Sequence, residues 1–259
     1  MKQTILSIKQ SALLEDLIVK HGQIVTSEHI YAQRKGLWDQ QATKNIITKL
    51  THNGWLIRVK RGLYAISELS NRGFLSLSPY VVANLLVNDS YVSFESALAY
   101  HGMFDQLTNK TISISRVQYK SVQLQSVEYS FVKVMDKWFF GWQEVSIDNR
   151  TVHMATAEKA LIDMIQFHKS TYTVDVVVEK LSLYKTSLDL QKMTEYLGKM
   201  SLTTVKVFGF LFDLLGIDSG NLYSQVKLKG THWMFFRDSK FNARWRLYYD
   251  AYFDKYKSS

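Results

Sequence analysis

The hydrophobic period changes once within the first 70 residues, from helical to alternating, and this change constrains the fold more than any other feature. Apolar residues at helical spacing predict three helices, over residues 7–20, 27–36 and 40–52. Alternation then predicts two short strands, over residues 55–60 and 63–66, joined by a turn at Arg61-Gly62. Three helices and a hairpin are the layout of a winged helix-turn-helix, whose third helix enters the major groove of DNA.

The third predicted helix carries side chains of the kinds that read DNA. Its buried stripe is expected at Ala42, Ile46 and Leu50, with Ile47 beside it. Gln and Asn can pair with an adenine edge, Lys can contact guanine or phosphate, and basic residues of the hairpin can neutralise phosphates. The candidate DNA-binding residues are Gln40, Gln41, Lys44, Asn45, Thr48, Arg58, Lys60 and Arg61. Two alternatives stay open: a polar helix face that is only solvated, and a winged helix that binds protein.

Positive charge is concentrated at the two ends of the chain. Residues 1–75 hold 11 Lys/Arg against 5 Asp/Glu, residues 76–226 hold 13 against 15, and residues 227–259 hold 8 against 3. A local basic excess favours a polyanion partner through attraction and counterion release. The alternative is a basic surface without a specific partner.

The remainder of the chain predicts a larger mixed domain. Ser78-Pro79 is a good helix start, and Ser93 is expected to cap the next helix. Alternating residues between 110 and 154 favour strands, an amphipathic helix follows Thr156, further helices reach Leu215, and stretches 233–237 and 244–249 look strand-like. The predicted fold class is α+β, with a winged helix-turn-helix over 1–70, a linker over 71–78 and a mixed domain over 79–259.

Several segments resemble one family, the AbiEi-type antitoxins. Gly54–Tyr64 is similar to the family's wing, and Tyr91–Gly102 to the first helix of its C-terminal domain. Ala155–Asp163, which reads ATAEKALID, is similar to a later family segment in which proline is common at the position of Ala157. Trp245–Leu247 is a weaker match. The matches occur in the family's order and span most of the chain.

The resemblance implies an antitoxin of a type IV toxin-antitoxin system that acts in abortive infection and phage defence. It implies that the winged helix represses its own operon by binding repeats in the promoter, as double-stranded DNA. It also implies that the larger domain neutralises a nucleotidyltransferase-like toxin without a stable complex. A dimer on DNA would suit repeated half-sites.

The sequence offers little that points to catalysis. It has no cysteine, and it lacks the phosphate-loop, dinucleotide, zinc-protease and serine-elbow motifs. His101 is expected to be structural at a helix end, and Glu158 to be a first-turn charge. We therefore expect no enzyme, no catalytic or metal residues and no cofactor. No run of about 18 apolar residues occurs, so we expect no membrane partner and a cytoplasmic location.

The last 30 residues mix aromatic and basic side chains. If the chain is an antitoxin, the neutralising surface is expected at Arg237, Lys240, Arg244 and Arg246. Such a mixture can also stack bases and hold phosphates of single-stranded nucleic acid, or the aromatic residues can simply fill a core. Two further functions stay open for the whole chain: a stand-alone repressor whose larger domain senses a ligand or dimerises, and an enzyme with a DNA-targeting domain.

Overall fold

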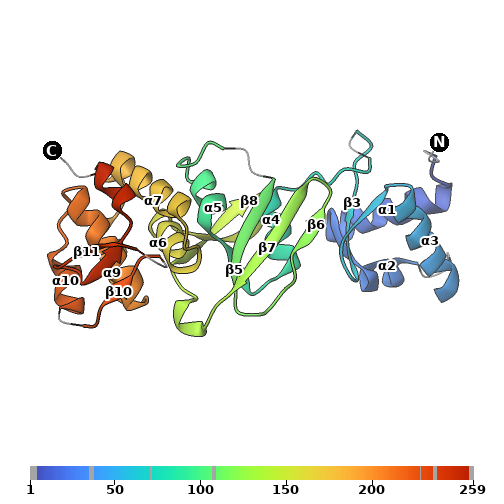
Figure 1. Ribbon diagram of the computed structural model, residues 1–259. Coiled ribbons are helices and arrows are strands. Elements are labelled where there is room, and N and C mark those ends of the chain that lie inside the picture. Colours follow the sequence, from blue (N-terminus) through green and yellow to red (C-terminus); the bar gives the residue numbers. More distant parts are fainter. Residues whose placement is uncertain are drawn as a thin grey trace. The chain divides into compact units, whose positions relative to one another are not determined.

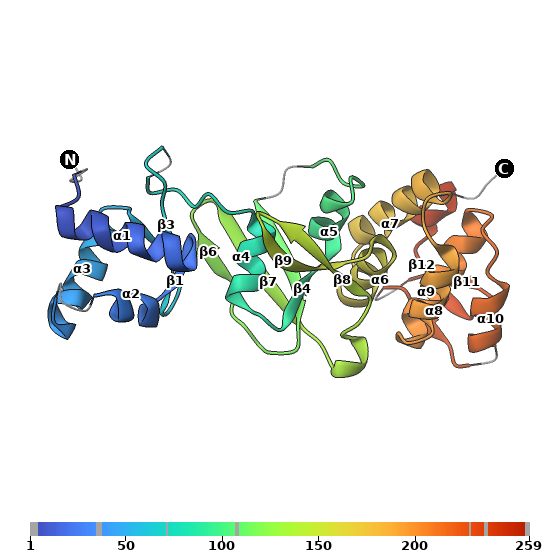
Figure 2. The ribbon, with the colours of Figure 1, turned by 180° about the vertical axis from the view of Figure 1, so that it is seen from behind.

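The fold combines helices and sheets in an α+β arrangement (Figures 1 and 2). It is known from a computed structural model that describes residues 5–34, 38–70, 72–106, 109–227, 229–235 and 238–256. The chain divides into two compact units. The first is Met1–Asn88 with Gln123–Val127, and the second is Asp89–Val122 with Glu128–Ser259. Residues 79–88, predicted to begin the larger domain, are grouped with the first unit by the packing of the chain.

The first unit contains helices that are followed by a hairpin. Its elements are α1 (Ile8–His21), β1 (Ile24–Thr26), α2 (Ser27–Gln33), α3 (Gln40–His52), β2 (Leu56–Lys60), β3 (Leu63–Ile66) and α4 (Pro79–Leu86). The strands form an antiparallel sheet in the order β1-β3-β2. The predicted helices and hairpin are confirmed within the described residues. Strand β1 was not predicted, because a strand of three residues leaves no readable alternation.

Local capping explains where these helices begin. Ser7 accepts a hydrogen bond from the backbone N–H of Gln10, and Thr26 accepts one from His29. Asp39 accepts one from Ala42 at 2.7 Å, which fixes the start of α3. Each cap satisfies a backbone donor that the first helical turn leaves without a partner.

One hydrophobic core holds the first unit together. Its buried residues are Leu13, Leu14, Leu17, Val25, Ile30, Ile47, Leu50, Trp55, Leu56 and Ile66. Leu50 and Ile47, both expected on the inner side of α3, are buried. Ala42 and Ile46 are only partly buried, and Thr43 is buried where the prediction placed Ala42. Thr43 can be buried because its hydroxyl donates to the carbonyl of Asp39 at 2.7 Å.

In the second unit, the strands of a six-stranded sheet come before a group of helices; most of one of its strands, β6 (Val122–Leu124), lies in the segment grouped with the first unit. The strand order is β6-β7-β5-β4-β9-β8. Strand β4 runs antiparallel to β5 and parallel to β9, β5 runs parallel to β7, and β8 runs antiparallel to β9. The elements up to β9 are β4 (Ser90–Val92), α5 (Phe94–Tyr100), β5 (Lys110–Ser115), β6 (Val122–Leu124), β7 (Val127–Lys133), η1 (Asp136–Trp138), β8 (Trp142–Ile147) and β9 (Arg150–Ala155).

Helices and a small sheet complete the second unit. The elements are α6 (Ala157–Phe167), α7 (Thr171–Tyr184), α8 (Leu190–Leu197), α9 (Leu202–Leu214), α10 (Gly220–Val226), β10 (His232–Trp233), β11 (Lys240–Asn242), β12 (Leu247–Tyr249) and η2 (Ala251–Tyr256). Helix α6 packs against α5, α7, α8 and α9, and every residue of Glu158–Ile165 is buried. The apolar helix expected before Leu215 is α9, which is almost wholly buried.

The C-terminal strands differ from the prediction. Of the strand predicted over 244–249, only β12 forms, because Ala243–Arg246 is a turn. Of the strand predicted over 233–237, Trp233 lies in β10, and residues 236 and 237 lie outside the described residues. The three short strands form a sheet in the order β10-β12-β11. In both views this small sheet lies beside α9 and α10 (Figures 1 and 2). Over the described part of the chain, every helix is too short or too polar to cross a bilayer.

Candidate nucleic-acid interface

The outer face of α3 is polar and open to solvent. Its five predicted contact residues, all exposed, are Gln40, Gln41, Lys44, Asn45 and Thr48. The amides of Gln41 and Asn45 lie one helical turn apart, and Gln41 Nε2 is 3.5 Å from Asn45 Oδ1. Thr48 donates its hydroxyl to the carbonyl of Lys44 at 3.0 Å. The structure therefore brings these five residues together on one surface.

Charge on α3 is of one sign. The helix contains no Asp or Glu, and its ionisable residues are Lys44, Lys49 and His52. Asp39 precedes the helix, and its carboxylate accepts a hydrogen bond from the backbone N–H of Ala42. Within the described residues, Lys44 makes no ion pair, so its charge is not neutralised by a neighbouring carboxylate. An anion that approaches this face meets uncompensated positive charge.

Two of the three predicted basic residues of the hairpin β2–β3 are exposed to solvent. Arg58 and Arg61 are exposed, and neither forms an ion pair within the described part of the chain. Lys60 differs, because it is partly buried and its ammonium donates to the carbonyl of Leu86 at 3.1 Å. Burial lowers the pKa of Lys60 below its usual range. Lys60 therefore anchors the hairpin to the end of α4, while the two arginines stay available.

The predicted antitoxin surface is not a set of free cations. Lys240 forms an ion pair with Asp254, and Arg244 Nη1 lies 3.2 Å from Asp213 Oδ1. Arg246 is exposed and has no ion-pair partner in the described residues. Arg237 lies outside the residues that the structure describes. Two of the four predicted cations are therefore already matched by carboxylates.

Sequence reasoning missed a buried polar cluster at the start of α6. The side chains of Lys159 and Asp163 are fully buried and form an ion pair. Lys159 Nζ also donates to the hydroxyl of Tyr91 at 3.0 Å, and Ser93 Oγ donates to Asp163 Oδ2 at 2.7 Å. Ser93 is the N-cap residue of α5, as predicted, but its hydroxyl donates to Asp163 and makes no capping hydrogen bond. The spacing of Lys159 and Asp163, four residues apart in an apolar segment, was the available signal.

Burial dominates the electrostatics of this cluster. It lowers the pKa of Lys159 and raises the pKa of Asp163, although their mutual attraction opposes both shifts. Burial also raises the pKa of Tyr91 well above its usual range, and the negative charge of Asp163 adds to that shift. The hydrogen bonds of this cluster join Tyr91 of β4 and Ser93 to α6.

Two other residues singled out from the sequence have structural contacts. His101 Nε2 lies 2.8 Å from the carbonyl oxygen of Ala155, which joins the end of α5 to β9. Glu158 is buried, accepts the backbone N–H of Asp189 at 3.2 Å, and pairs with Lys192 at 3.4 Å. Glu158 does lie in the first turn of α6, but its contacts extend to the start of α8.

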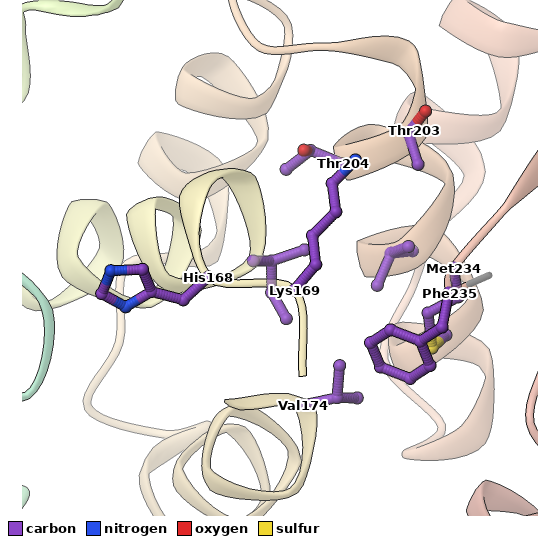
Figure 3. A pocket seen from close by; sticks show the side chains of 9 residues that line it. His168, Lys169, Val174, Thr203, Thr204, Met234 and Phe235 are labelled. Carbon is purple, nitrogen blue, oxygen red and sulfur yellow. The ribbon is translucent and has the colours of Figure 1, made fainter. Parts of the chain in front are cut away.

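The cavities of the second unit differ in size and character. A pocket of about 10 Å³ lies between α6, α7 and α9, large enough for one water molecule. Figure 3 shows Lys169 extending toward Thr203 and Thr204, while the ring of His168 is turned away from the other labelled side chains. A wider polar groove of about 610 Å³ lies between α8 and α10. Within the described residues, no three His, Asp or Glu side chains are placed to hold a metal ion.

Comparison with known proteins defines the fold alone. No protein-family model matches the chain, and no curated protein matches it. The crystal structure of the RV2827C protein from Mycobacterium tuberculosis is similar, with a TM-score of 0.67 and 12% sequence identity. The similarity covers 95% of this chain and 92% of that one, so the two proteins share a fold over nearly their whole length.

Proposed function

We propose that this chain is a DNA-binding autorepressor and antitoxin. Its first unit is a winged helix-turn-helix that binds repeats in its own promoter, and its second unit neutralises a nucleotidyltransferase-like toxin. The observation that carries the DNA-binding half is the acid-free polar face of α3 beside the two free arginines of the hairpin, Arg58 and Arg61.

The dimensions of α3 suit this role. A helix of 13 residues is about 20 Å long, and the major groove of B-DNA, about 12 Å wide, admits one helix. Gln40 and Gln41 begin the helix, at the end that recognition helices present to base edges. Gln41 and Asn45 can each pair with an adenine edge, while Arg58 and Arg61 can neutralise phosphates.

The antitoxin half of the proposal is supported by the sequence resemblance and by what its segments do in the fold. Tyr91–Gly102 and Ala155–Asp163 supply the strands and helices that meet at the buried cluster of Lys159 and Asp163. These two segments therefore define the centre of the second unit. The neutralising surface would be formed by Arg237, Lys240, Arg244 and Arg246, and the pairing of Lys240 and Arg244 with carboxylates would have to be broken or shared.

A stand-alone repressor is the second candidate. The polar groove between α8 and α10, lined by Gln191, Glu195, Asp218, Asn221 and Gln225 among others, is large enough for a small polar ligand. In this alternative, a ligand in the groove changes DNA binding, and no toxin is involved.

DNA binding is tested by fluorescence anisotropy with the intact chain. The probe is duplex from immediately upstream of the gene, compared with scrambled duplex across a salt series. We expect tight, sequence-dependent binding that Lys44→Ala and Arg61→Ala each weaken, with Arg61→Ala reducing the salt slope by about one. Lys49→Ala is the matched control, because Lys49 is an exposed lysine of the same helix outside the predicted contact set.

Two results would count against the proposal. Unchanged affinity in both Lys44→Ala and Arg61→Ala would remove these residues from the interface. Weak binding that is equal on the two duplexes and lost with salt would leave only non-specific attraction.

Toxin neutralisation is tested separately, by growth rescue during expression of the neighbouring gene. We expect Lys44→Ala to keep rescue while it loses repression, because α3 belongs to the first unit. Reversing the charges of Arg237, Lys240 and Arg244 should abolish rescue. Full rescue by that variant would exclude this surface, and DNA binding that responds to a small molecule without any toxin would favour the stand-alone repressor.

A further inference from the structure

Three aromatic rings lie side by side across the small C-terminal sheet. Trp233 on β10 and Phe241 on β11 are the direct partners of Tyr248 on the central strand β12. The rings of Trp233 and Tyr248 are stacked, with centroids 5.1 Å apart and planes at 10°. The ring of Phe241 lies 5.0 Å from Tyr248 on the other side. Together these residues form a continuous ladder, here called the aromatic platform.

The aromatic platform is the outer face of this sheet. Trp233 is 52% exposed and Phe241 is 48% exposed, although both are large apolar side chains. The chain neighbours of Trp233 and Tyr248, which are Met234, Leu247 and Tyr249, are buried, whereas Lys240 beside Phe241 is exposed. At β10 and β12 the sheet therefore has a packed inner face and an aromatic outer face. Contiguous exposed apolar surface of this kind commonly marks a binding site.

The chain segment that carries the platform is basic, which favours an anionic partner. Residues 227–259 hold 8 Lys/Arg against 3 Asp/Glu. The three carboxylates are used locally: Asp238 accepts the backbone N–H of Phe235, Asp250 accepts that of Tyr252, and Asp254 pairs with Lys240. The cations that stay exposed without an ion pair in the described residues are Lys227, Lys229 and Arg246.

We propose that the aromatic platform binds single-stranded nucleic acid. Bases stack on the two exposed outer rings, Trp233 and Phe241, which lie on either side of Tyr248, and the phosphates are attracted to Arg246, the exposed cation directly before β12. A single strand fits because its bases are free to stack on protein rings, whereas duplex bases already stack on one another. Every base has a π-face, so binding is tolerant of sequence. This site is separate from the duplex-reading surface of the first unit and does not depend on it.

The platform is tested by fluorescence anisotropy with oligothymidylate and oligouridylate of about 20 nucleotides, using the intact chain. We expect Trp233→Ala and Phe241→Ala each to weaken binding at least about 5-fold, the loss expected for one base-stacking contact. Trp233→Phe should keep most of the affinity because it keeps a ring. Tyr172→Ala is the matched control, since Tyr172 is 50% exposed but lies on α7.

Each outcome of this experiment decides the proposal. Loss in the two alanine variants, with retention in Trp233→Phe and Tyr172→Ala and with unchanged thermal unfolding, supports it, and the two oligonucleotides show whether DNA or RNA is preferred. Undetectable binding, or binding equal in all variants and removed by salt, overturns it. Ring-dependent binding of polyglutamate but not of either oligonucleotide would assign the platform to an acidic protein and also overturn it. Promoter-duplex affinity, measured on the same variants, should stay unchanged, which separates this proposal from the repressor proposal.

Discussion

Lys159 is a fully buried cation that is surrounded by partners of three kinds. Its ammonium pairs with Asp163, donates to the hydroxyl of Tyr91, and lies 4.8 Å from the centre of the Phe140 ring. The backbone at Gly141 has φ +77, and an added Cβ there would come within 2.9 Å of the Lys159 side chain. The local chain is therefore shaped around this lysine, and the ion pair persists because each charge keeps its counter-charge.

This arrangement predicts how substitutions in the pair behave. Lys159→Met leaves Asp163 buried without its cation, and we expect it to lower the free energy of unfolding by about 3–5 kcal/mol. The double variant Lys159→Met, Asp163→Leu removes both charges and should be less destabilised than Lys159→Met alone. Urea unfolding at pH 7 measures the losses in Lys159→Met, in Asp163→Leu alone and in the double variant. A double variant whose loss equals the sum of the two single losses would show that the charges are not coupled.

Gly141→Ala tests the close approach to Lys159. We expect it to destabilise the protein more than Gly216→Ala does, since both glycines have a positive φ but an added Cβ at Gly216 has open space. The difference between the two unfolding midpoints reports the steric contact, because the backbone strain is common to both. Equal midpoints would contradict this assignment.

Helix α9 is shaped to receive one tryptophan. Gly209 lies in the middle of the helix, and an added Cβ would fall 2.1 Å from the Trp245 ring. Trp245 is 1% exposed, and its indole N–H donates to Asp213 at 2.7 Å, one helical turn after Gly209. A glycine normally weakens a helix. Here it allows the turn before β12 to pack directly on the helix backbone.

Gly209→Ala is therefore expected to destabilise the protein, whereas the same substitution at an exposed helix position normally stabilises it. Alanine should stabilise an exposed helix position by about 1 kcal/mol, but at this site we expect destabilisation by at least about 1–3 kcal/mol through overpacking. Thermal unfolding of Gly209→Ala, Trp245→Leu and the double variant checks this. The double variant should be no less stable than Trp245→Leu, because the smaller side chain makes room.

Elements with a capping residue or a long run of regular hydrophobic spacing could be predicted from the sequence, whereas very short strands could not. Helix α3 and the hairpin β2–β3 follow from Asp39, from the apolar spacing and from the turn at Gly62. Strands β1, β4 and β10 contain three residues or fewer, and they exist because a neighbouring strand pairs with them.

The candidate site was also predictable only in part from the sequence. The exposed face of α3 follows from helical periodicity alone. The role of Lys60 does not, because its partner is the carbonyl of Leu86, which lies 26 residues away. The aromatic platform likewise depends on the register of three strands, which the sequence pattern did not define.

Histidines in both units have lowered pKa values in the folded protein, so acid is expected to reduce the stability of the fold. Desolvation is the largest cause that lowers the pKa of His21, His168 and His232 below the usual value. His168 is stacked on Phe94, with ring centroids 4.3 Å apart. The unfolded chain therefore binds protons at these positions more readily than the folded chain does.

The stability of the protein is therefore expected to fall as the pH falls. The stability that these histidines support is complete above the pKa of unfolded histidine, about 6.5, and is lost as the pH falls through the lower folded values. We expect the melting temperature to fall between pH 7.5 and pH 5.5, and to fall less in His168→Phe, which keeps the stack on Phe94 without a titrating group. Differential scanning calorimetry across this range is the measurement. A melting temperature that rises as the pH falls would contradict the prediction.

The short segment Gln123–Val127 belongs to the first unit although the chain enters the second unit before it. Gln125 contributes through its side chain, which bonds to the backbone of Gly73 and Leu75. The polypeptide therefore passes between the units three times. During synthesis, the first unit cannot be completed until residue 127 has left the ribosome, when β4, α5 and β5 have also emerged. The first unit is therefore complete only after part of the second unit has emerged, unlike domains that fold one after another as the chain emerges.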